Sequence, residues 1–227
     1  MDILLIAGLW LKSSVWDAVA SELEARGHRA VPVALPGQGD GRSSAILADQ
    51  VAAVLAALDD THGKALVVGH SASSSLAWIA ADARPGKVAK VVLIGGMPVS
   101  DGQAYADFFG MVDGGMPFPG WGAFDGPDSD DLSDDAKSAI ADGAIPVPEG
   151  VATGIVSLTD ERRFGVPVVM VCPEFSPEQA KSWVDAGEIP ELAKAESVHY
   201  VDIDSGHWPM FTKPVELAEI LADLASV

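Results

Sequence analysis

Two short segments of the sequence carry a hydroxyl and an imidazole at positions suited to nucleophilic chemistry. The first is Gly69-His70-Ser71-Ala72-Ser73, which ends an apolar run starting at Ala65 and precedes a helical pattern. A serine on such a tight strand-to-helix turn holds its hydroxyl away from the sheet, and small residues on either side relieve crowding. The N–H groups that begin the helix favour a developing oxyanion. We therefore predict that Ser71 is a catalytic nucleophile.

The second segment supplies a base for that serine. Ser205-Gly206-His207-Trp208-Pro209 directly follows the apolar run Val198–Ile203. A histidine on the loop after that strand can reach the serine across the carboxyl edge of a parallel sheet. It would accept the proton of Ser71 during attack and return it to the leaving group. His207 is therefore the predicted general base.

The elements that must position these residues alternate along the chain. Continuous apolar strands that alternate with helices predict an α/β fold, with a mainly parallel sheet covered by helices on both faces. Six strands are expected, at Ile3–Ala7, Arg29–Leu35, Ala65–Gly69, Val88–Gly95, Val166–Cys172 and Val198–Ile203. Helices are expected at 14–26, 44–59, 72–83, 177–186 and 214–225.

The stretch 97–165 interrupts this alternation. It is rich in glycine, proline and aspartate, and it is too long for a plain loop in a compact domain. It also holds apolar residues that a disordered linker would lack, namely Met111, Met116, Phe118, Trp121 and Phe124. We expect residues 1–96 and 166–227 to form the core, with 97–165 inserted as a small cap or lid.

Several motifs together resemble the α/β-hydrolase superfamily over nearly the whole chain. The opening Ile6-Ala7-Gly8-Leu9-Trp10 and the turn Leu35-Pro36-Gly37-Gln38-Gly39 are similar to motifs of its small branch, which contains plant methylesterases and hydroxynitrile lyases. The order of serine before histidine also matches. The resemblance implies an oxyanion hole formed by the backbone N–H groups of Leu9 and Ala72. Two departures stand out, because Ala7 replaces the family's histidine and Ser73 replaces the last glycine of G-x-S-x-G.

The third member of the catalytic triad stays open at this point. The family usually places an acid after the penultimate strand, where Glu174 is the nearest carboxylate, although an alignment puts Phe175 at the usual position. Some relatives place the acid after the preceding strand, where this chain has Asp101. Either carboxylate would orient the imidazole and stabilise its protonated form.

The favoured function is a serine hydrolase that cleaves a small neutral carboxylic ester, thioester or lactone through an acyl-enzyme. Trp10, His70 and Trp208 adjoin the catalytic loops and are candidates for the substrate pocket. A hydroxynitrile-lyase activity is the alternative, but those relatives have a lysine beside the histidine, where this chain has Trp208, and Lys213 lies further on. A non-catalytic ligand-binding protein on the same scaffold is the third hypothesis.

Composition restricts the partners. Acidic residues outnumber basic ones by 33 to 14, which gives a formal net charge of −19 in 227 residues. Such a surface repels nucleic acid and anionic lipid, and it disfavours anionic substrates. The single cysteine excludes an intrachain disulfide, and no metal or cofactor motif is evident. We expect a cytoplasmic protein without cofactors that acts on a small molecule as a monomer or homodimer.

Overall fold

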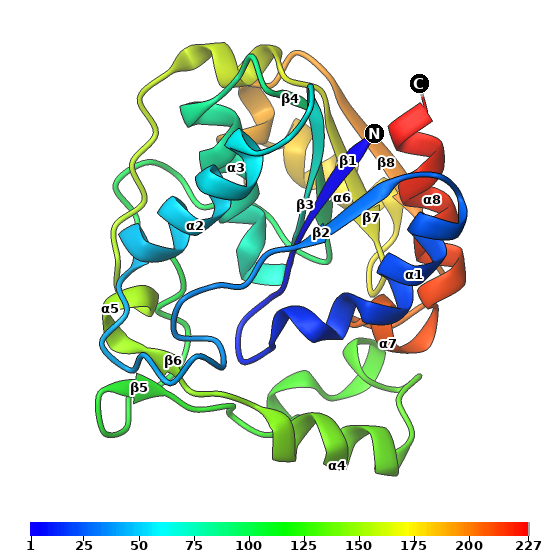
Figure 1. Ribbon diagram of the computed structural model, residues 1–227. Helices are drawn as coiled ribbons and strands as arrows, with labels where there is room; N and C mark the ends of the chain where they lie inside the picture. Colours follow the sequence, from blue (N-terminus) through cyan, green and yellow to red (C-terminus); the bar gives the residue numbers. More distant parts are fainter. Residues whose placement is uncertain (227) are drawn as a thin grey trace.

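The computed structural model describes residues 1–226 and is built around one six-stranded sheet (Figure 1). All neighbouring strands pair in parallel, in the order β2-β1-β3-β4-β7-β8. The predicted α/β fold and its six strands are confirmed. The strands are β1 (Asp2–Ile6), β2 (Arg29–Pro32), β3 (Ala65–His70), β4 (Val88–Ile94), β7 (Val168–Cys172) and β8 (Val198–Asp202).

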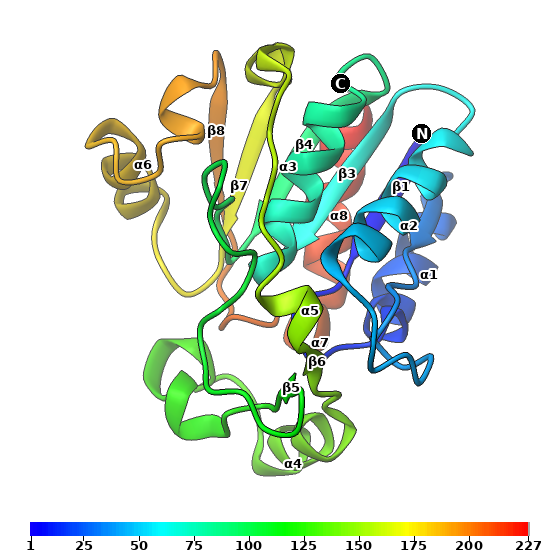
Figure 2. The same ribbon diagram turned by 90° about the vertical axis from the view of Figure 1, so that its left-hand side faces the viewer.

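Helices cover both faces of the sheet because alternate strand residues point to opposite sides. Leu4 and Val67 pack on one face, toward α2 (Leu47–Asp59), α3 (Ser74–Ala83) and α6 (Pro177–Asp185). Ile3 and Val68 pack on the other, toward α1 (Asp17–Ala25) and α8 (Pro214–Ser226). Figure 2 shows the two helical layers on either side of the strands. The inner strands β1, β3 and β7 are buried on both faces, which explains their continuous rather than alternating hydrophobicity.

Some boundaries differ from the predicted ones. The helix expected at 44–59 begins at Leu47, because the carboxylate of Asp49 accepts a hydrogen bond from the N–H of Ile46 and caps the first turn. A short helix, α7 (Pro209–Thr212), follows β8 and was not predicted.

Within residues 1–226, no helix is both long and apolar enough to cross a lipid bilayer. Three 3₁₀ turns complete the core, η1 (Ser13–Trp16), η2 (Ser71–Ser73) and η6 (Leu192–Lys194).

The insertion segment, residues 97–165, leaves the sheet after β4 and returns at β7. Much of it lies beyond the carboxyl ends of the strands, at the bottom of Figures 1 and 2, and its last part runs back beside α3. Ser133 caps its longest helix by accepting a hydrogen bond from the N–H of Ala136. Its elements are β5 (Gly115–Met116), η3 (Trp121–Phe124), η4 (Gly126–Asp128), α4 (Asp134–Gly143), β6 (Val147–Pro148), α5 (Glu149–Ala152) and η5 (Glu161–Gly165).

A buried ion cluster fastens the returning end of the insertion segment to the core. Arg163 pairs with Asp82 at 3.1 Å and with Glu191 at 3.0 Å, and all three side chains are buried. The Asp82 carboxylate also accepts hydrogen bonds from the N–H groups of Thr159 and Asp160. Because each buried charge has a partner, the cluster specifies one path for the chain between the insertion segment and β7.

Candidate active site

Ser71 is the first residue of η2 and lies on a strained turn directly after β3. Its backbone φ is +56°, a left-handed conformation that is uncommon for residues with a side chain. Two glycines, one in β3 and one after β4, pack directly against this turn. A Cβ on Gly69 would collide with the backbone of Ser73, and a Cβ on Gly96 would collide with the backbone of Ser71. The sharp turn presents the hydroxyl beyond the sheet, as the sequence predicts.

A chain of hydrogen bonds links Ser71, His207 and Glu174. The Oγ of Ser71 lies 2.9 Å from His207 Nε2, and His207 Nδ1 lies 2.7 Å from Glu174 Oε1. The carboxylate can only accept, so Nδ1 carries a proton and donates it, which leaves Nε2 of the neutral imidazole to accept from the serine. The three groups follow β3, β8 and β7, so the carboxyl edge of the sheet brings them together.

Asp101, the alternative acid, is engaged elsewhere. Its Oδ1 accepts a hydrogen bond of 2.8 Å from the N–H of Leu158, and it forms no ion pair with His207. The structure therefore brings Glu174 and not Asp101 to the imidazole. Gly95 makes room for this arrangement, since its hypothetical Cβ would lie 3.2 Å from both Glu174 Oε2 and His207 Nδ1.

The backbone of His207 is held from two sides. Its N–H donates to the carbonyl of Asp128 at 2.8 Å, and its own carbonyl accepts from His70 Nε2 at 2.8 Å. The preceding N–H, that of Gly206, donates to the Asp131 carboxylate at 2.8 Å. Gly206 is required there, because a Cβ would collide with Asp128 and Asp131. The insertion segment thus helps to place the imidazole.

Burial controls the protonation of several groups around the site. Desolvation, followed by the nearby His207, lowers the pKa of His70 to about 3, so its ring is neutral and Nε2 is the protonated nitrogen. Burial and then the charge of Glu174 raise the pKa of Asp128. Burial also raises the pKa of Cys172 to about 12, so this thiol does not compete with Ser71 as a nucleophile.

Aromatic rings cover the imidazole. Phe124 stacks on His207 with a ring-centroid distance of 6.3 Å, and Trp208 meets the same imidazole edge-on at 4.8 Å. Trp10 continues the cluster at 6.0 Å from Phe124, and its indole N–H donates to the Met116 carbonyl. Trp208 therefore lies beside the imidazole, and Trp10 belongs to the same aromatic cluster through Phe124. The substrate-pocket role of both residues stays a prediction. His70 is buried and packs between His207, with 5.0 Å between ring centroids, and Trp16, and its Nε2 donates to the His207 carbonyl. Its place in the substrate pocket stays a prediction.

The predicted oxyanion donors belong to two neighbouring turns. Ala72 follows Ser71 in η2, and Leu9 lies in the turn after β1. The turn after β1 is tightly tied down. The carbonyl of Ala7 accepts from the Ser73 hydroxyl, and the carbonyl of Gly8 accepts from the Gln38 amide.

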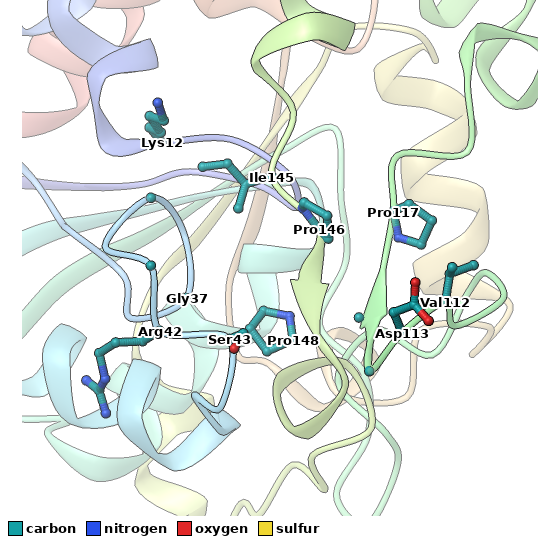
Figure 3. Close-up of a pocket in the computed structure, with 14 residues that line it drawn as sticks. Lys12, Gly37, Arg42, Ser43, Val112, Asp113, Pro117, Ile145, Pro146 and Pro148 are labelled. Atoms are coloured by element: carbon teal, nitrogen blue, oxygen red, sulfur yellow. The ribbon is translucent and has the colours of Figure 1, made fainter.

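A separate surface cavity of about 620 Å³ lies between the 37–43 loop and the β5–β6 ribbon. Figure 3 shows Lys12 and Arg42 at one side and Asp113 and Pro117 at the other, with Pro146 and Pro148 between them. Neither Ser71 nor His207 lines this cavity. Gly37 and Gly39 do line it, so the loop that presents Gln38 to Gly8 has its outer side on the cavity.

Comparison with known proteins adds a family to this geometry. The profile of one protein family, described as "Alpha/beta hydrolase family", matches residues 3–220. The chain belongs to the alpha/beta hydrolase family.

Relatives of this hydrolase cover nearly its whole length. Methylesterase 7 of Arabidopsis thaliana is 26% identical, over 97% of this chain and 95% of the relative. An extracellular alpha/beta-hydrolase from a Paenibacillus species superposes with a TM-score of 0.77 at 19% identity, covering 98% of this chain and 97% of the other. A pyrethroid hydrolase from Sphingobium faniae JZ-2 superposes with a TM-score of 0.74 at 22% identity, covering 100% and 98%. These structures share the fold.

Sequence reasoning missed several residues around the site of this hydrolase. Phe124 and Asp131 lie in the insertion segment, where no sequence motif places a side chain beside His207. Gln38 lies in the turn motif 35–39, but nothing in the sequence predicts a role for its side chain. Ser73 is visible in the sequence as a departure from the G-x-S-x-G pattern. Only the structure shows that its hydroxyl bonds to the Ala7 carbonyl.

Proposed function

We propose that this alpha/beta hydrolase is a serine carboxylic ester hydrolase that works through an acyl-enzyme on Ser71. The observation that carries the proposal is the continuous hydrogen-bond chain from Ser71 Oγ to His207 to Glu174, at 2.9 and 2.7 Å. Both distances lie in the range expected of a nucleophile, its base and the group that orients the base. The similarity to a methylesterase over nearly the whole chain supports an ester as substrate.

The first half-reaction forms the acyl-enzyme. Ser71 Oγ attacks the ester carbonyl carbon while its proton passes to His207 Nε2, and Glu174 stabilises the imidazolium that results. Charge moves onto the carbonyl oxygen, which the N–H groups of Leu9 and Ala72 would bind. The tetrahedral intermediate then collapses. The bond to the alcohol oxygen breaks, and that oxygen takes the proton from His207.

The second half-reaction returns the enzyme to its starting state. Water takes the place of the alcohol and loses a proton to His207 as its oxygen attacks the acyl carbon on Ser71. The same two N–H groups bind the second oxyanion. When this intermediate collapses, the bond to Ser71 Oγ breaks and the serine recovers its proton. The products are one alcohol and one carboxylic acid.

The surroundings of the imidazole favour an apolar, uncharged substrate. Phe124 and Trp208 pack against the imidazole and Trp10 packs against Phe124, so the surroundings are apolar, and a formal net charge of −19 disfavours anions. Small neutral esters fit this environment, with thioesters and lactones as chemically related substrates.

Active-site labelling tests the proposal. A fluorophosphonate probe should label the folded protein at Ser71, and Ser71→Ala should abolish both labelling and hydrolysis of a p-nitrophenyl acyl ester. Ser74→Ala is the matched control, because this buried hydroxyl on the neighbouring helix turn has no hydrogen-bond partner. A folded wild-type protein that neither takes the label nor cleaves any ester would overturn the proposal.

A further inference from the structure

We infer that Ser73 and Gln38 are positioning residues, which hold the loop Ala7-Gly8-Leu9 so that the N–H of Leu9 faces the reacting carbonyl oxygen. The inference rests on the proposed function, since it names the residues that orient one donor of the oxyanion hole in that reaction. Neither side chain touches Ser71 Oγ or His207 in the structure. Each instead donates a hydrogen bond to one backbone carbonyl of the loop.

Ser73 ties the nucleophile turn to this loop. Its Oγ lies 2.5 Å from the carbonyl oxygen of Ala7, and the side chain is fully buried. A carbonyl only accepts, so the single hydroxyl proton of Ser73 is used there. The Tyr105 hydroxyl, 3.2 Å away and also buried, must then donate to Ser73 Oγ. The residue that departs from the G-x-S-x-G pattern therefore makes a directed bond between the two turns that form the oxyanion hole.

Gln38 acts on the peptide that contains the donor itself. The carbonyl of Gly8 and the N–H of Leu9 belong to one planar trans peptide and point in opposite directions. The Gln38 amide donates to that carbonyl at 3.3 Å from a buried side chain. Fixing the carbonyl fixes the plane, and therefore the direction of the N–H. A donor on the carbonyl also polarises the peptide and strengthens its N–H as a donor.

The space around Gly8 explains why the loop is held by hydrogen bonds. A Cβ on Gly8 would lie 2.7 Å from His70 Nδ1, so this position must stay glycine. Glycine leaves the backbone more conformational freedom than any other residue. The bonds from Ser73 and Gln38 remove that freedom on both sides of Gly8. Ser74 shows that burial alone does not require such a bond, because its buried hydroxyl has no partner.

Steady-state kinetics on Ser73→Ala and Gln38→Met test the inference. Each substitution removes the donor and keeps most of the side-chain volume. Loss of a whole oxyanion donor lowers kcat about 10²- to 10³-fold, so loosening one should lower kcat about tenfold, with KM changed less than about twofold. The affinity for a trifluoromethyl ketone, whose hemiketal adduct with the serine hydroxyl carries an oxyanion, should fall by a similar factor. Ser74→Ala should change neither quantity.

Each outcome separates this inference from the proposed function. If either folded variant shows the paired loss of kcat and of ketone affinity, the positioning role holds, even if the other variant fails to fold. If both variants fold and keep wild-type kcat and ketone affinity, or lose only thermal stability, the inference is wrong and the esterase proposal stands. If the wild-type protein itself has no esterase activity and no ketone affinity, the proposed function has failed.

Discussion

The two sides of Ser71 are built in different ways. On the base side, His207 and Glu174 present charged or titratable side chains, and the insertion segment contacts their loop through Asp128 and Asp131. On the oxyanion side, the proposed donors are the backbone N–H groups of Leu9 and Ala72, and the neutral side chains of Ser73 and Gln38 bond to the loop that contains Leu9. The base side should therefore depend on charge and on the insertion segment. The oxyanion side should depend on backbone placement alone.

The largest expected effects come from the reacting pair. Ser71→Ala and His207→Ala should each lower kcat by at least about 10⁴-fold, because either change stops formation of the acyl-enzyme. The double variant should be no slower than either single one, since the two residues act as a unit. Ester hydrolysis by all three variants checks this. If the loss of kcat in the double variant were the product of the two single losses, Ser71 and His207 would not share one proton-transfer step.

The next effect separates the two candidate acids. Glu174→Gln should lower kcat on the order of 10³-fold, because an amide neither stabilises the imidazolium nor holds the reactive tautomer. Asp101→Asn is the matched change and should leave kcat within about twofold of wild type. Its Oδ1 can still accept from Leu158, so the fold is kept. If Asp101→Asn lost most of its kcat while Glu174→Gln stayed active, Asp101 and not Glu174 would be the acid of the triad.

A smaller effect tests the contribution of the insertion segment. Asp131→Ala removes the acceptor for the Gly206 N–H beside the catalytic histidine, and a bond of about 1 kcal/mol corresponds to about a fivefold loss of kcat. Asp130→Ala is the control, because this exposed neighbour carries the same charge. Equal rates for the two variants would show that the insertion segment does not place His207.

The smallest effect near neutral pH concerns His70. The unfolded chain protonates this imidazole below about pH 6.5, whereas the folded protein does so only near pH 3. Between these values the unfolded state binds one more proton, so the free energy of unfolding falls as the pH falls, by up to about 1.4 kcal/mol per pH unit. His70→Gln keeps a donor for the His207 carbonyl and cannot be protonated.

Urea unfolding between pH 6.5 and pH 4 makes this comparison. The wild-type protein should lose stability more steeply than His70→Gln as the medium becomes more acidic. Equal slopes for the two proteins would mean that His70 takes up its proton over the same pH range in the folded and the unfolded state. In that case the ring would not be the neutral support for the base side described above.

The sequence predicts the base side better than the oxyanion side, and the reason is physical. Ser71 and His207 are reactive side chains at the ends of apolar strands, so residue type and strand order together locate them. The sequence does not decide between Glu174 and Asp101 as the acid, because both follow strands that end at the same edge of the sheet. A backbone donor such as the N–H of Leu9 does not depend on residue type, so residue type does not reveal it. Ser73 is visible as a departure from G-x-S-x-G and Gln38 lies in a turn motif, but neither residue type tells which carbonyl the side chain bonds.

The same contrast applies to the fold. The inner strands are the most readable, because both faces of strands such as β3 and β7 are buried, which makes each one a continuous apolar run. The path of the insertion segment is not readable, because its position depends on long-range contacts such as those of Arg163 with Asp82 and Glu191. The contact of Phe124 with His207 depends on that path and so escaped prediction.

Rapid mixing with p-nitrophenyl acetate, followed by intact mass spectrometry of the quenched protein, tests the central claim most directly. We predict a burst of one p-nitrophenolate per protein molecule and a mass increase of one acetyl group that peptide mapping assigns to Ser71. The acetyl group should build up and then disappear as the substrate is exhausted. Turnover without any acyl adduct, or an adduct that persists in Ser71→Ala together with wild-type activity, would contradict the account.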